Sequence, residues 1–404
     1  MDYLQKQSPP FNDSKVSRKY IHDDLAFYVL SKLAIKSLKR FGCVRKSWSI
    51  LFDDSDFMAL FRNHFITRHG SDDDHHTFLL IHHRELPATP DYRFHAELHL
   101  LENRLKLNLP PPFQVDDNHL SILGKTSVNG IFCIGQYFVG GDSNKVIYVL
   151  WNPAIQEFFV IPPSPGHLLP KHRVHVLHDF HGFGYAQVRD DFKVIQYVSF
   201  DTSGRGDGYD DYPRIMYDPF FEIYSLRNNS WKILHIDDMS LRYVGNAFTG
   251  DELYMNGACH WLVNSQPDKI VLLSFDLSDE MFFTTPIGEI SDYNYGHLAV
   301  LNGSIAYIIN HDNDDIFHIS ILGELGVKES WIKLFIYGPI PSMDWPLIGF
   351  GKKGYVFFRK KDDELAYVDL STQIIEELGV KGEDYCCKIG IYKESLVSIR
   401  GSTN

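Results

Sequence analysis

The chain has 404 residues, of which 39 are Lys or Arg and 52 are Asp or Glu, so its formal net charge at pH 7 is −13. Hydrophobic residues make up 44% and aromatic residues 14%, which is typical of a globular protein rich in strands. Residues 1–66 hold 11 basic and 7 acidic residues, whereas the rest hold 28 and 45. Nucleic acid and anionic membrane surfaces repel such an acidic body, so we expect neither as a partner.

The spacing of the cysteines and the lack of targeting segments indicate the cellular compartment of the protein. Residues 1–15 lack the apolar centre of a signal peptide, and no run of 18 apolar residues occurs. We therefore expect an intracellular protein, cytoplasmic, nuclear or both. We also expect no metal and no cofactor, because each motif that imitates such a site has a structural explanation. Five cysteines follow neither a metal-binding nor a disulfide spacing, which favours a reducing compartment: Cys43, Cys133, Cys259, Cys386 and Cys387.

Residues 23–66 carry apolar side chains at helical spacing, in three successive segments. The first is capped by Asp23 or Asp24, and its apolar face holds Leu25, Val29, Leu30 and Leu33. The second begins at Ser37 with Gly42 as a joint, and its apolar face holds Leu38, Phe41, Val44, Trp48 and Leu51. The third begins at Ser55 and carries Phe57, Leu60, Phe61, His64 and Phe65. A bundle of about 45 residues is near the lower limit for a self-sufficient core, so its apolar faces need a further cover.

From residue 77 the pattern changes to short apolar runs separated by Gly, Asn, Asp and Pro, which indicate strands and turns. Two pieces recur along this part. One is a Gly-containing turn followed by an apolar strand, as in SVNGIFCIG, YMNGACHWLV, VLNGSIAYII and FGKKGYVFFR. The other is a pair of strands in which Asp, Asn or Ser ends the first strand, and an aromatic residue and Pro or Leu follow: 146–163, 221–234, 270–287, 316–335 and 364–380.

Units that recur every ~40 to 70 residues are typical of the blades of a β-propeller once loops are allowed for. Five units are visible, and we expect CCKIGIYKESLVSI to pair with TFLLIHH (77–83) as a sixth. This pairing would close the ring and leave no sheet edge exposed. The predicted fold is a small helical bundle followed by an all-β propeller of about six blades. Seven blades stay open, because the unit at 180–235 is long.

The helical stretch resembles the F-box of plant proteins at a set of matching positions: Asp24, Leu25, Val29, Leu30, Leu33, Lys36, Ser37, Leu38, Phe41, Val44, Lys46 and Trp48. The rest resembles their F-box-associated interaction domain, a kelch-like propeller, through LWNPAIQEF, HGFGYAQVRDDFKVI, EIYSLRNNSWK, NGACHWL, SFDLSDEMF and DELAYVDLSTQIIEELGVKG. The resemblance covers residues 21 to about 397. It implies a flexible segment (1–19), an F-box (20–66), a linker (67–76) and an F-box-associated propeller (77–404).

This resemblance implies a non-catalytic, substrate-recognition subunit of an SCF-type (Skp–cullin–F-box) ubiquitin ligase. The F-box would bind a Skp-type adaptor, and through it a cullin-RING scaffold, while the propeller would capture an unknown target protein for ubiquitination. The implied adaptor contacts, or their immediate support, are Ile21, Leu25, Val29, Leu30, Leu33, Leu38, Val44 and Trp48. Helical spacing alone leaves open whether Phe41 and Trp48 belong to the core or to the interface.

The sequence departs from the F-box pattern at three places. His22 stands where the family has a Pro, so the fixed φ that starts the first helix is lost. Ala34 replaces the second Pro. Arg45 replaces a Cys and brings a bulky charge near the expected contact. These departures predict weakened adaptor binding, or binding restricted to particular adaptor paralogues.

Three motifs imitate catalytic or ligand sites. The motif G-x-G-x-x-G at Gly349, Gly351 and Gly354 precedes a predicted strand, whereas a dinucleotide loop needs a helix there. Cys259 and His260 are neighbours on a predicted strand and point to opposite faces, so they cannot form a nucleophilic dyad. A zinc site is disfavoured for four histidines whose surroundings suggest strand or loop: His172, His175, His178 and His181.

Four tryptophans sit in repeat positions, where core packing explains them better than ligand recognition: Trp151, Trp231, Trp261 and Trp331. Target contacts are expected in the loops between strands, with 201–220 as one candidate. One alternative is an S-locus type F-box protein that recognises pistil ribonucleases. Alternatives of another class are a propeller hydrolase, which needs carboxylates grouped near the axis, and a propeller scaffold independent of any adaptor.

Overall fold

The computed structural model describes residues 23–33, 35–67, 77–85, 94–111, 113, 119–138, 145–164, 175–201, 218–234, 245–246, 252–266, 269–287, 296–310, 316–351, 354–382 and 387–399. Contacts divide the chain into two compact units, residues 1–61 and 62–404. The boundary between the units falls inside the last helix of the helical region.

The helical region contains α1 (Asp23–Ser31), α2 (Ile35–Gly42), α3 (Lys46–Ser49), the 3-10 turn η1 (Leu51–Asp53) and α4 (Ser55–Thr67). The predicted second helix is divided in two, because α2 ends at the predicted joint, Gly42, and α3 begins only at Lys46. Between them Arg45 has an extended backbone, with φ −144° and ψ 133°. The helical hydrogen-bond pattern therefore cannot run through it. The carboxylate of Asp54 accepts the backbone N–H of Phe57 at 2.8 Å and caps α4.

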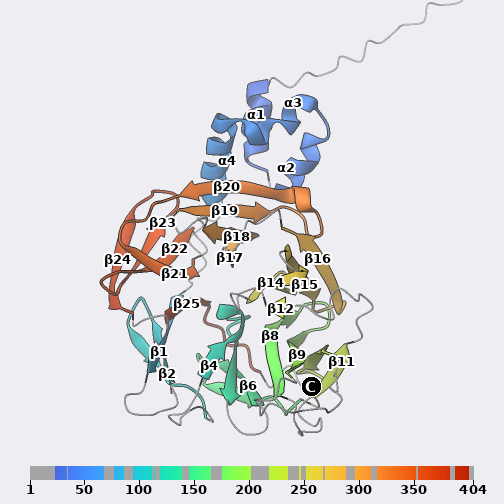
Figure 1. Ribbon diagram of the computed structural model, residues 1–404, viewed down its shortest axis with the longest axis vertical. Helices are drawn as coiled ribbons and strands as arrows, with labels where there is room; N and C mark the ends of the chain where they lie inside the picture. Colours follow the sequence, from blue (N-terminus) through green and yellow to red (C-terminus); the bar gives the residue numbers. More distant parts are fainter. Residues whose placement is uncertain are drawn as a thin grey trace, which may run out of the picture. The chain divides into compact units, whose positions relative to one another are not determined.

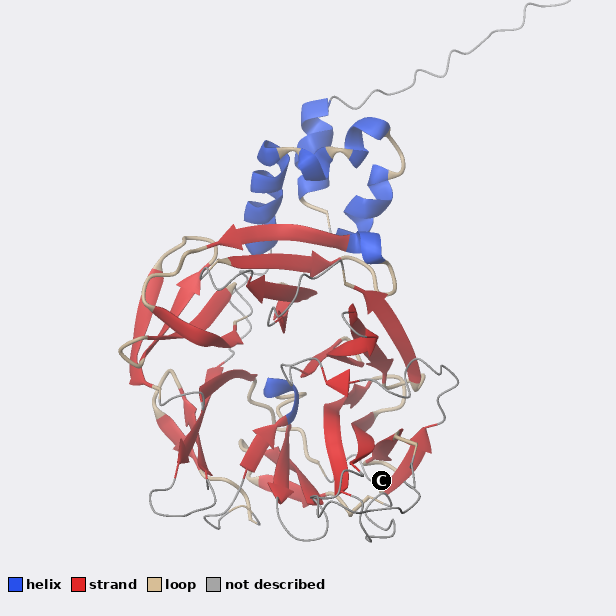
Figure 2. Cartoon of the chain, viewed as in Figure 1, coloured by secondary structure: helices blue, strands red, loops and turns tan. Residues whose placement is uncertain are grey.

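The described part of the second unit forms six antiparallel sheets, arranged as the blades of a propeller (Figures 1 and 2). Blade 1 contains β1 (Thr77–Glu85), β2 (Phe94–Leu100), β3 (Leu105–Leu107) and β25 (Cys387–Tyr392). Blade 2 contains β4 (His119–Ile122), β5 (Phe132–Phe138), β6 (Lys145–Asn152) and β7 (Glu157–Val160), with η2 (Leu123–Lys125) after β4. Blade 3 contains β8 (His175–Ala186), β9 (Asp191–Asp201), β10 (Phe220–Ser225) and β11 (Ser230–Leu234).

The remaining three blades follow in chain order. Blade 4 contains β12 (Gly245–Asn246), β13 (Glu252–Met255), β14 (Ala258–Gln266), β15 (Lys269–Asp276) and β16 (Met281–Pro286). Blade 5 contains β17 (Gly296–Leu301), β18 (Ser304–Asn310), β19 (Phe317–Leu322), η5 (Lys328–Ser330) and β20 (Trp331–Tyr337). Blade 6 contains β21 (Met343–Phe350), β22 (Tyr355–Lys360), β23 (Glu364–Asp369) and β24 (Ile375–Lys381).

The ring is closed by the pairing that the sequence predicts. Strand β25 lies antiparallel to β1, with Leu79 opposite Gly390 and Ile81 opposite Lys388. The question of a seventh blade is settled by the described parts of the unit at 180–235, whose strands all belong to one four-stranded sheet. That unit is long chiefly because 18 residues separate the end of β9 at Asp201 from the start of β10 at Phe220.

The core lies in the seams between neighbouring blades. Strand β9, second in blade 3, is buried along most of its length on both faces, because each face meets another sheet. The outermost strands are more exposed, as in β11 and β16. One seam cluster joins Ile195 and Phe221 of blade 3 to Trp261 and Phe275 of blade 4. Similar clusters fill the seams between blades 1 and 2, 2 and 3, 4 and 5, and 6 and 1.

Both recurrent sequence pieces correspond to hairpin turns. Three of the Gly-containing pieces are Asn-Gly turns that lead into β5, β14 and β18, and both residues have positive φ, for example 52° and 82° at Asn256 and Gly257. Asn-Gly is favoured in such two-residue hairpins because both positions need φ above zero. The other piece is the hairpin between the third and fourth strands. In blade 4 the Asp276 carboxylate accepts the N–H groups of Ser278 and Asp279 in this turn.

The recurrent aromatic residue and proline join successive blades. The indole N–H of Trp231 in blade 3 donates to the carbonyl of Pro162, which follows blade 2, at 2.7 Å. The indole of Trp331 in blade 5 donates likewise to the carbonyl of Pro286, at the end of blade 4, at 3.1 Å. Trp151 and Trp261 are buried in seam clusters. The packing role that the sequence predicts for these tryptophans is confirmed.

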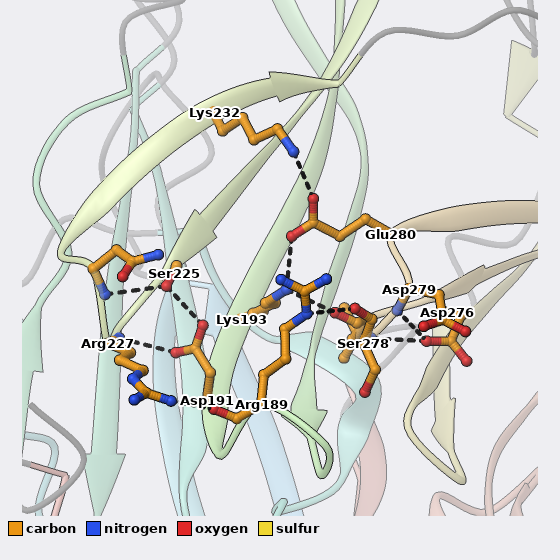
Figure 3. A network of polar contacts seen from close by, with 12 residues as sticks. Arg189, Asp191, Lys193, Ser225, Arg227, Lys232, Asp276, Ser278, Asp279 and Glu280 are labelled. Atoms are coloured by element: carbon orange, nitrogen blue, oxygen red, sulfur yellow. Dashed lines mark hydrogen bonds and ion pairs between the residues drawn. The ribbon is translucent and has the colours of Figure 1, made fainter.

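The outer part of the seam between blades 3 and 4 is polar (Figure 3). The ammonium group of Lys193, which is almost fully buried, donates to the carbonyl of Leu277 at 2.7 Å and to the carboxylate of Glu280 at 2.8 Å. The exposed Lys232 contacts the other oxygen of Glu280 at 2.7 Å. Burial by itself raises the pKa of Glu280, but the hydrogen bonds from both lysines outweigh it and lower that pKa. A buried cation is thus paired across two blades.

Candidate functional site

The apolar residues of the helical unit divide into a buried set and an exposed set. Phe57 is fully buried, lies edge-on to Phe27 at 5.1 Å and is stacked with Phe61 at 6.3 Å between ring centroids. Leu30 and Leu38 are also buried. These side chains form the core that holds the helices together.

Among the side chains that the structure describes, the exposed set consists of six large apolar ones: Leu25, Tyr28, Val29, Phe41, Val44 and Ile50. Leu25 is 57% exposed and Val44 is 70% exposed. Leu25, Tyr28 and Val29 are three and four residues apart, so they lie on the same side of α1. The ammonium group of Lys32 lies 4.0 Å above the Tyr28 ring, a cation–π contact at the border of this surface. We refer to these six residues as the exposed helical set.

The residues implied as adaptor contacts are found in both sets. Three of them, Leu25, Val29 and Val44, belong to the exposed helical set. Leu30 and Leu38 are buried and can only support an interface. Leu33 is half-buried, as is Trp48, whose ring meets Phe41 edge-on at 6.1 Å. Ile21 lies outside the described residues, as do His22 and Ala34.

Helical spacing missed two members of the exposed helical set. Tyr28 follows Leu25 by three residues, so the i, i+3 relation could have indicated it. Ile50 lies between α3 and η1, outside any regular helix, and periodicity gives no signal there. The departing residue Arg45 is half-buried at the start of α3.

The propeller has two unequal edges, which follow from its antiparallel sheets. In most blades the turn between the first two strands and the turn between the last two lie at the same edge. These turns are short, such as the four residues between Ala186 and Asp191 and the two between Leu301 and Ser304. We call this edge the hairpin edge. The second-to-third strand connections and those between blades leave from the opposite edge, which we call the loop edge.

The candidate target loop at 201–220 belongs to the loop edge. It joins β9 to β10, and of its residues Asp201 and 218–220 are described. The rest of the loop, and with it the expectation of target contacts there, lies outside the described residues.

A chain of buried polar groups crosses the seam between blades 2 and 3. The hydroxyl of Tyr148 contacts Nδ1 of His181 at 2.5 Å and donates to Oε1 of Gln196 at 2.6 Å. The amide of Gln196 and the hydroxyl of Ser164 both donate to Oε1 of Glu222. All five residues are buried. This carboxylate is therefore held inside a seam by donors from two blades.

The motifs that imitate sites have the structural roles predicted for them. Strand β22 begins at Tyr355, one residue after Gly354, so no helix faces the glycines. Cys259 packs in the seam between blades 3 and 4, and burial raises the pKa of its thiol well above the usual range. Its neighbour His260 contacts the hydroxyl of Ser274 at 2.8 Å, and burial lowers the pKa of His260 to about 4.

Three of the four spaced histidines lie on a strand, β8, and the fourth, His172, lies outside the described residues. Within the described ranges, no three His, Cys, Asp or Glu side chains gather closely enough to hold a metal ion. Among the helices that the structure describes, none combines the length and apolar character needed to cross a membrane.

Comparison with known proteins identifies the family of the strand-rich part. The sequence profile of the F-box associated beta propeller domain matches residues 98–399. The chain is 24% identical over 270 residues to the F-box protein CPR1 of Arabidopsis thaliana, covering 62% of this chain and 63% of that protein. It is 22% identical over 359 residues to the Arabidopsis protein At3g17490, named as a candidate F-box protein, with 86% and 82% covered. The Arabidopsis F-box/kelch-repeat protein At3g23880 is 23% identical over 262 residues, with 64% and 63% covered. The chain thus spans slightly less than two thirds of the length of CPR1.

Proposed function

The chain belongs to the F-box associated β-propeller family, and we propose that it is a substrate-recognition subunit of an SCF-type ubiquitin ligase. In this proposal residues 20–66 form an F-box that binds a Skp-type adaptor, residues 67–76 form a linker, and residues 77–404 form the propeller that captures a target protein. The adaptor connects the chain to a cullin-RING scaffold. The chain itself carries out no chemistry, since ubiquitin transfer belongs to the other subunits.

One observation carries the proposal: the helical unit exposes six large apolar side chains beside its own buried core. Exposed apolar residues that occur singly are ordinary, but six within 26 residues of a small unit are many, and this supports a surface that binds another protein. Leu25, Val29 and Val44 belong both to this set and to the contacts that the F-box resemblance implies. They are therefore the residues on which we place adaptor binding.

The mechanism of such a receptor is proximity. A target held on the propeller is kept near the ubiquitin-charged enzyme, which raises its effective concentration without any new chemical group on this chain. We place target capture on the loop edge of the propeller, because it carries long connections, such as the 18 residues between β9 and β10, that offer room for variation. Pistil ribonucleases, recognised by S-locus type relatives, remain one alternative class of target.

The test is co-purification of the full chain with a panel of plant Skp-type adaptors. The variant Leu25→Asp combined with Val44→Asp places two carboxylates in the exposed helical set and removes no buried side chain. Its expected effect is loss of adaptor capture by a factor of about 30 or more, the range of interface hot spots. Stability should change by about 0.5 kcal/mol or less at each site, because both residues are exposed.

A matched control is Val188→Asp in the turn between β8 and β9, where the valine is 88% exposed. This change has the same chemistry on the propeller and should leave adaptor capture unchanged. Capture by the native chain that survives the Leu25/Val44 double change would contradict the assigned surface. Failure of the native chain to bind any adaptor would favour a propeller scaffold that works without one.

A further inference from the structure

The segment that follows strand β25, residues 393–399, extends from blade 1 across blade 2, and we call it the β25 extension. The extension starts beside the residues that lead into β5, which we call the inner turn of blade 2. There the hydroxyl of Ser127 accepts the N–H of Lys393 at 3.0 Å. Ser395 then lies against Gly130, where any Cβ would collide with it. The extension ends at Ile399, which is fully buried in the seam between blades 2 and 3.

Asn152 ends β6, at the turn between β6 and β7 that we call the outer turn of blade 2. Its side chain binds the middle of the β25 extension. Its side-chain amide nitrogen donates to the carbonyl of Ser395 at 2.9 Å and to the carbonyl of Val397 at 2.8 Å. Its side-chain oxygen accepts the N–H of Ala154 at 3.0 Å, which forms the turn. Asn152 is completely buried, so both donors and the acceptor of its amide are used inside the protein.

The same turn in other blades shows that the amide is not needed for the turn itself. The equivalent residue is Asp276 in blade 4, which accepts two backbone N–H groups of its own turn, and Asp369 in blade 6, which accepts one. A carboxylate cannot donate a hydrogen bond. The presence of asparagine instead of aspartate in blade 2 is therefore explained by the two carbonyls of the β25 extension, because the turn itself needs only the side-chain oxygen.

Glu157, at the start of β7, binds the far end of the extension. Its carboxylate accepts the hydroxyl of Ser398 at 3.2 Å and the backbone N–H of Ile399 at 3.0 Å. Most of these contacts are to backbone atoms, which any extended peptide presents. The side chain at the Ile399 position therefore determines which peptide sequences fit. Leu396 is 82% exposed, so its side chain does not contribute to that choice.

We propose that the outer turn of blade 2, with Asn152 and Glu157 as its polar contacts and the Ile399 position as its apolar pocket, is a binding site for an extended peptide. Its resident ligand is the β25 extension, which holds the ring closed at a second point beyond the pairing of β25 with β1. Because the ligand is tethered, its effective concentration is in the millimolar range or above, so it excludes competing peptides. This inference goes beyond the proposed function and does not depend on adaptor binding.

The first test measures hydrogen exchange of residues 393–399 in the full chain carrying Asn152→Asp. This change keeps the oxygen that forms the turn and replaces two donors by an acceptor facing two carbonyls. We expect exchange of the extension to become at least tenfold faster, while β14 and β15 remain protected. The control is Asp369→Asn, the reverse substitution at the equivalent position of blade 6. It should change the hydrogen-exchange rate of the extension less than twofold. Unchanged exchange in Asn152→Asp would overturn the proposal.

The second test supplies the ligand from outside. A labelled peptide of sequence KESLVSIRG is titrated into the full chain carrying Ile399→Ala, whose own extension is weakened, and into the native chain. We expect saturable binding to the variant, at least tenfold tighter than to the native chain. A peptide with Ala at the Ile399 position should bind at least tenfold more weakly. If the unaltered peptide binds neither chain, the site is not a peptide site, and the β25 extension is only part of the fold.

Discussion

The two units of this chain treat their apolar side chains differently. Among the described residues, six exposed large apolar side chains lie between residues 25 and 50, whereas thirteen are distributed over the whole propeller. The helical unit covers only part of its apolar surface with its own helices. The propeller covers nearly all of its own, because every sheet lies between two others and the ring has no free end.

This difference separates two ways of binding a partner. A helical unit that leaves apolar residues exposed is suited to one permanent kind of partner with a complementary apolar surface. A sealed propeller has to recognise its partners through turns and connections, which can vary without disturbing the seams. Under the proposed function, one architecture would therefore combine a constant contact with a variable one.

The largest expected effect is that of Phe57→Ala in the core of the helical unit, which tests whether the two units are stabilised separately. Removing this fully buried ring should cost about 3–5 kcal/mol, which is comparable to the whole stability of so small a unit. We expect residues 23–61 to lose protection in hydrogen exchange, while the main thermal transition of the propeller stays in place. An equal fall in both would show that the two units are not stabilised separately.

A smaller effect is expected at the polar seam between blades 3 and 4. Glu280→Gln removes the carboxylate that pairs with Lys193 and leaves a buried ammonium group with one carbonyl partner. We expect a loss of about 2–3 kcal/mol in the free energy of unfolding, somewhat below the usual cost of breaking a fully buried pair, because Glu280 itself is partly exposed.

The matched control for that seam is Lys232→Gln. Lys232 binds the same carboxylate from the surface, so its loss should cost about 0.5 kcal/mol or less. Chemical denaturation of both variants measures the contrast. Equal losses from the two substitutions would mean that the seam is not stabilised by the buried cation.

The smallest effect is a dependence of stability on pH from His260. Burial holds its folded-state pKa near 4, whereas the unfolded chain has the ordinary value near 6.5. Between these values the unfolded chain binds a proton that the folded chain does not, so stability falls as pH falls. The expected contribution between pH 7 and pH 5 is roughly 2 kcal/mol.

His260→Gln removes this titration. The difference in unfolding free energy between the native chain and the variant should change by that amount over the same range of pH. A difference that stays constant from pH 7 to pH 5 would show that His260 is protonated in the folded state as easily as in the unfolded one.

Much of the propeller could be predicted because its turns repeat. Asn256-Gly257 and Asp276 mark the two hairpins of blade 4 by local chemistry, and the same chemistry returns in other blades. The closure of β25 onto β1 could be predicted because an open ring would leave two free edges. The role of Asn152 could not be predicted in this way, since its partners, Ser395 and Val397, lie more than 240 residues away in sequence.

The exposure of the apolar helical residues could be predicted less completely. Helical spacing groups Leu25 and Leu30 together because both are apolar and near in sequence, yet one is exposed and the other buried. Leu30 follows by three residues Phe27, whose ring meets Phe57 of α4, so Leu30 lies on the core side of α1. A periodic pattern does not say which side of a helix the core will cover. Ile50 was missed for the opposite reason, because it lies where no period exists.

The most direct test of the account is a hydrogen-exchange footprint of a bound Skp-type adaptor on the full chain. We predict that protection on binding is confined to residues 25–50, and that residues 77–399 exchange as in the free chain. Protection that appears on the propeller and spares the helices would contradict it, because the surface that binds the adaptor would then lie in the wrong unit.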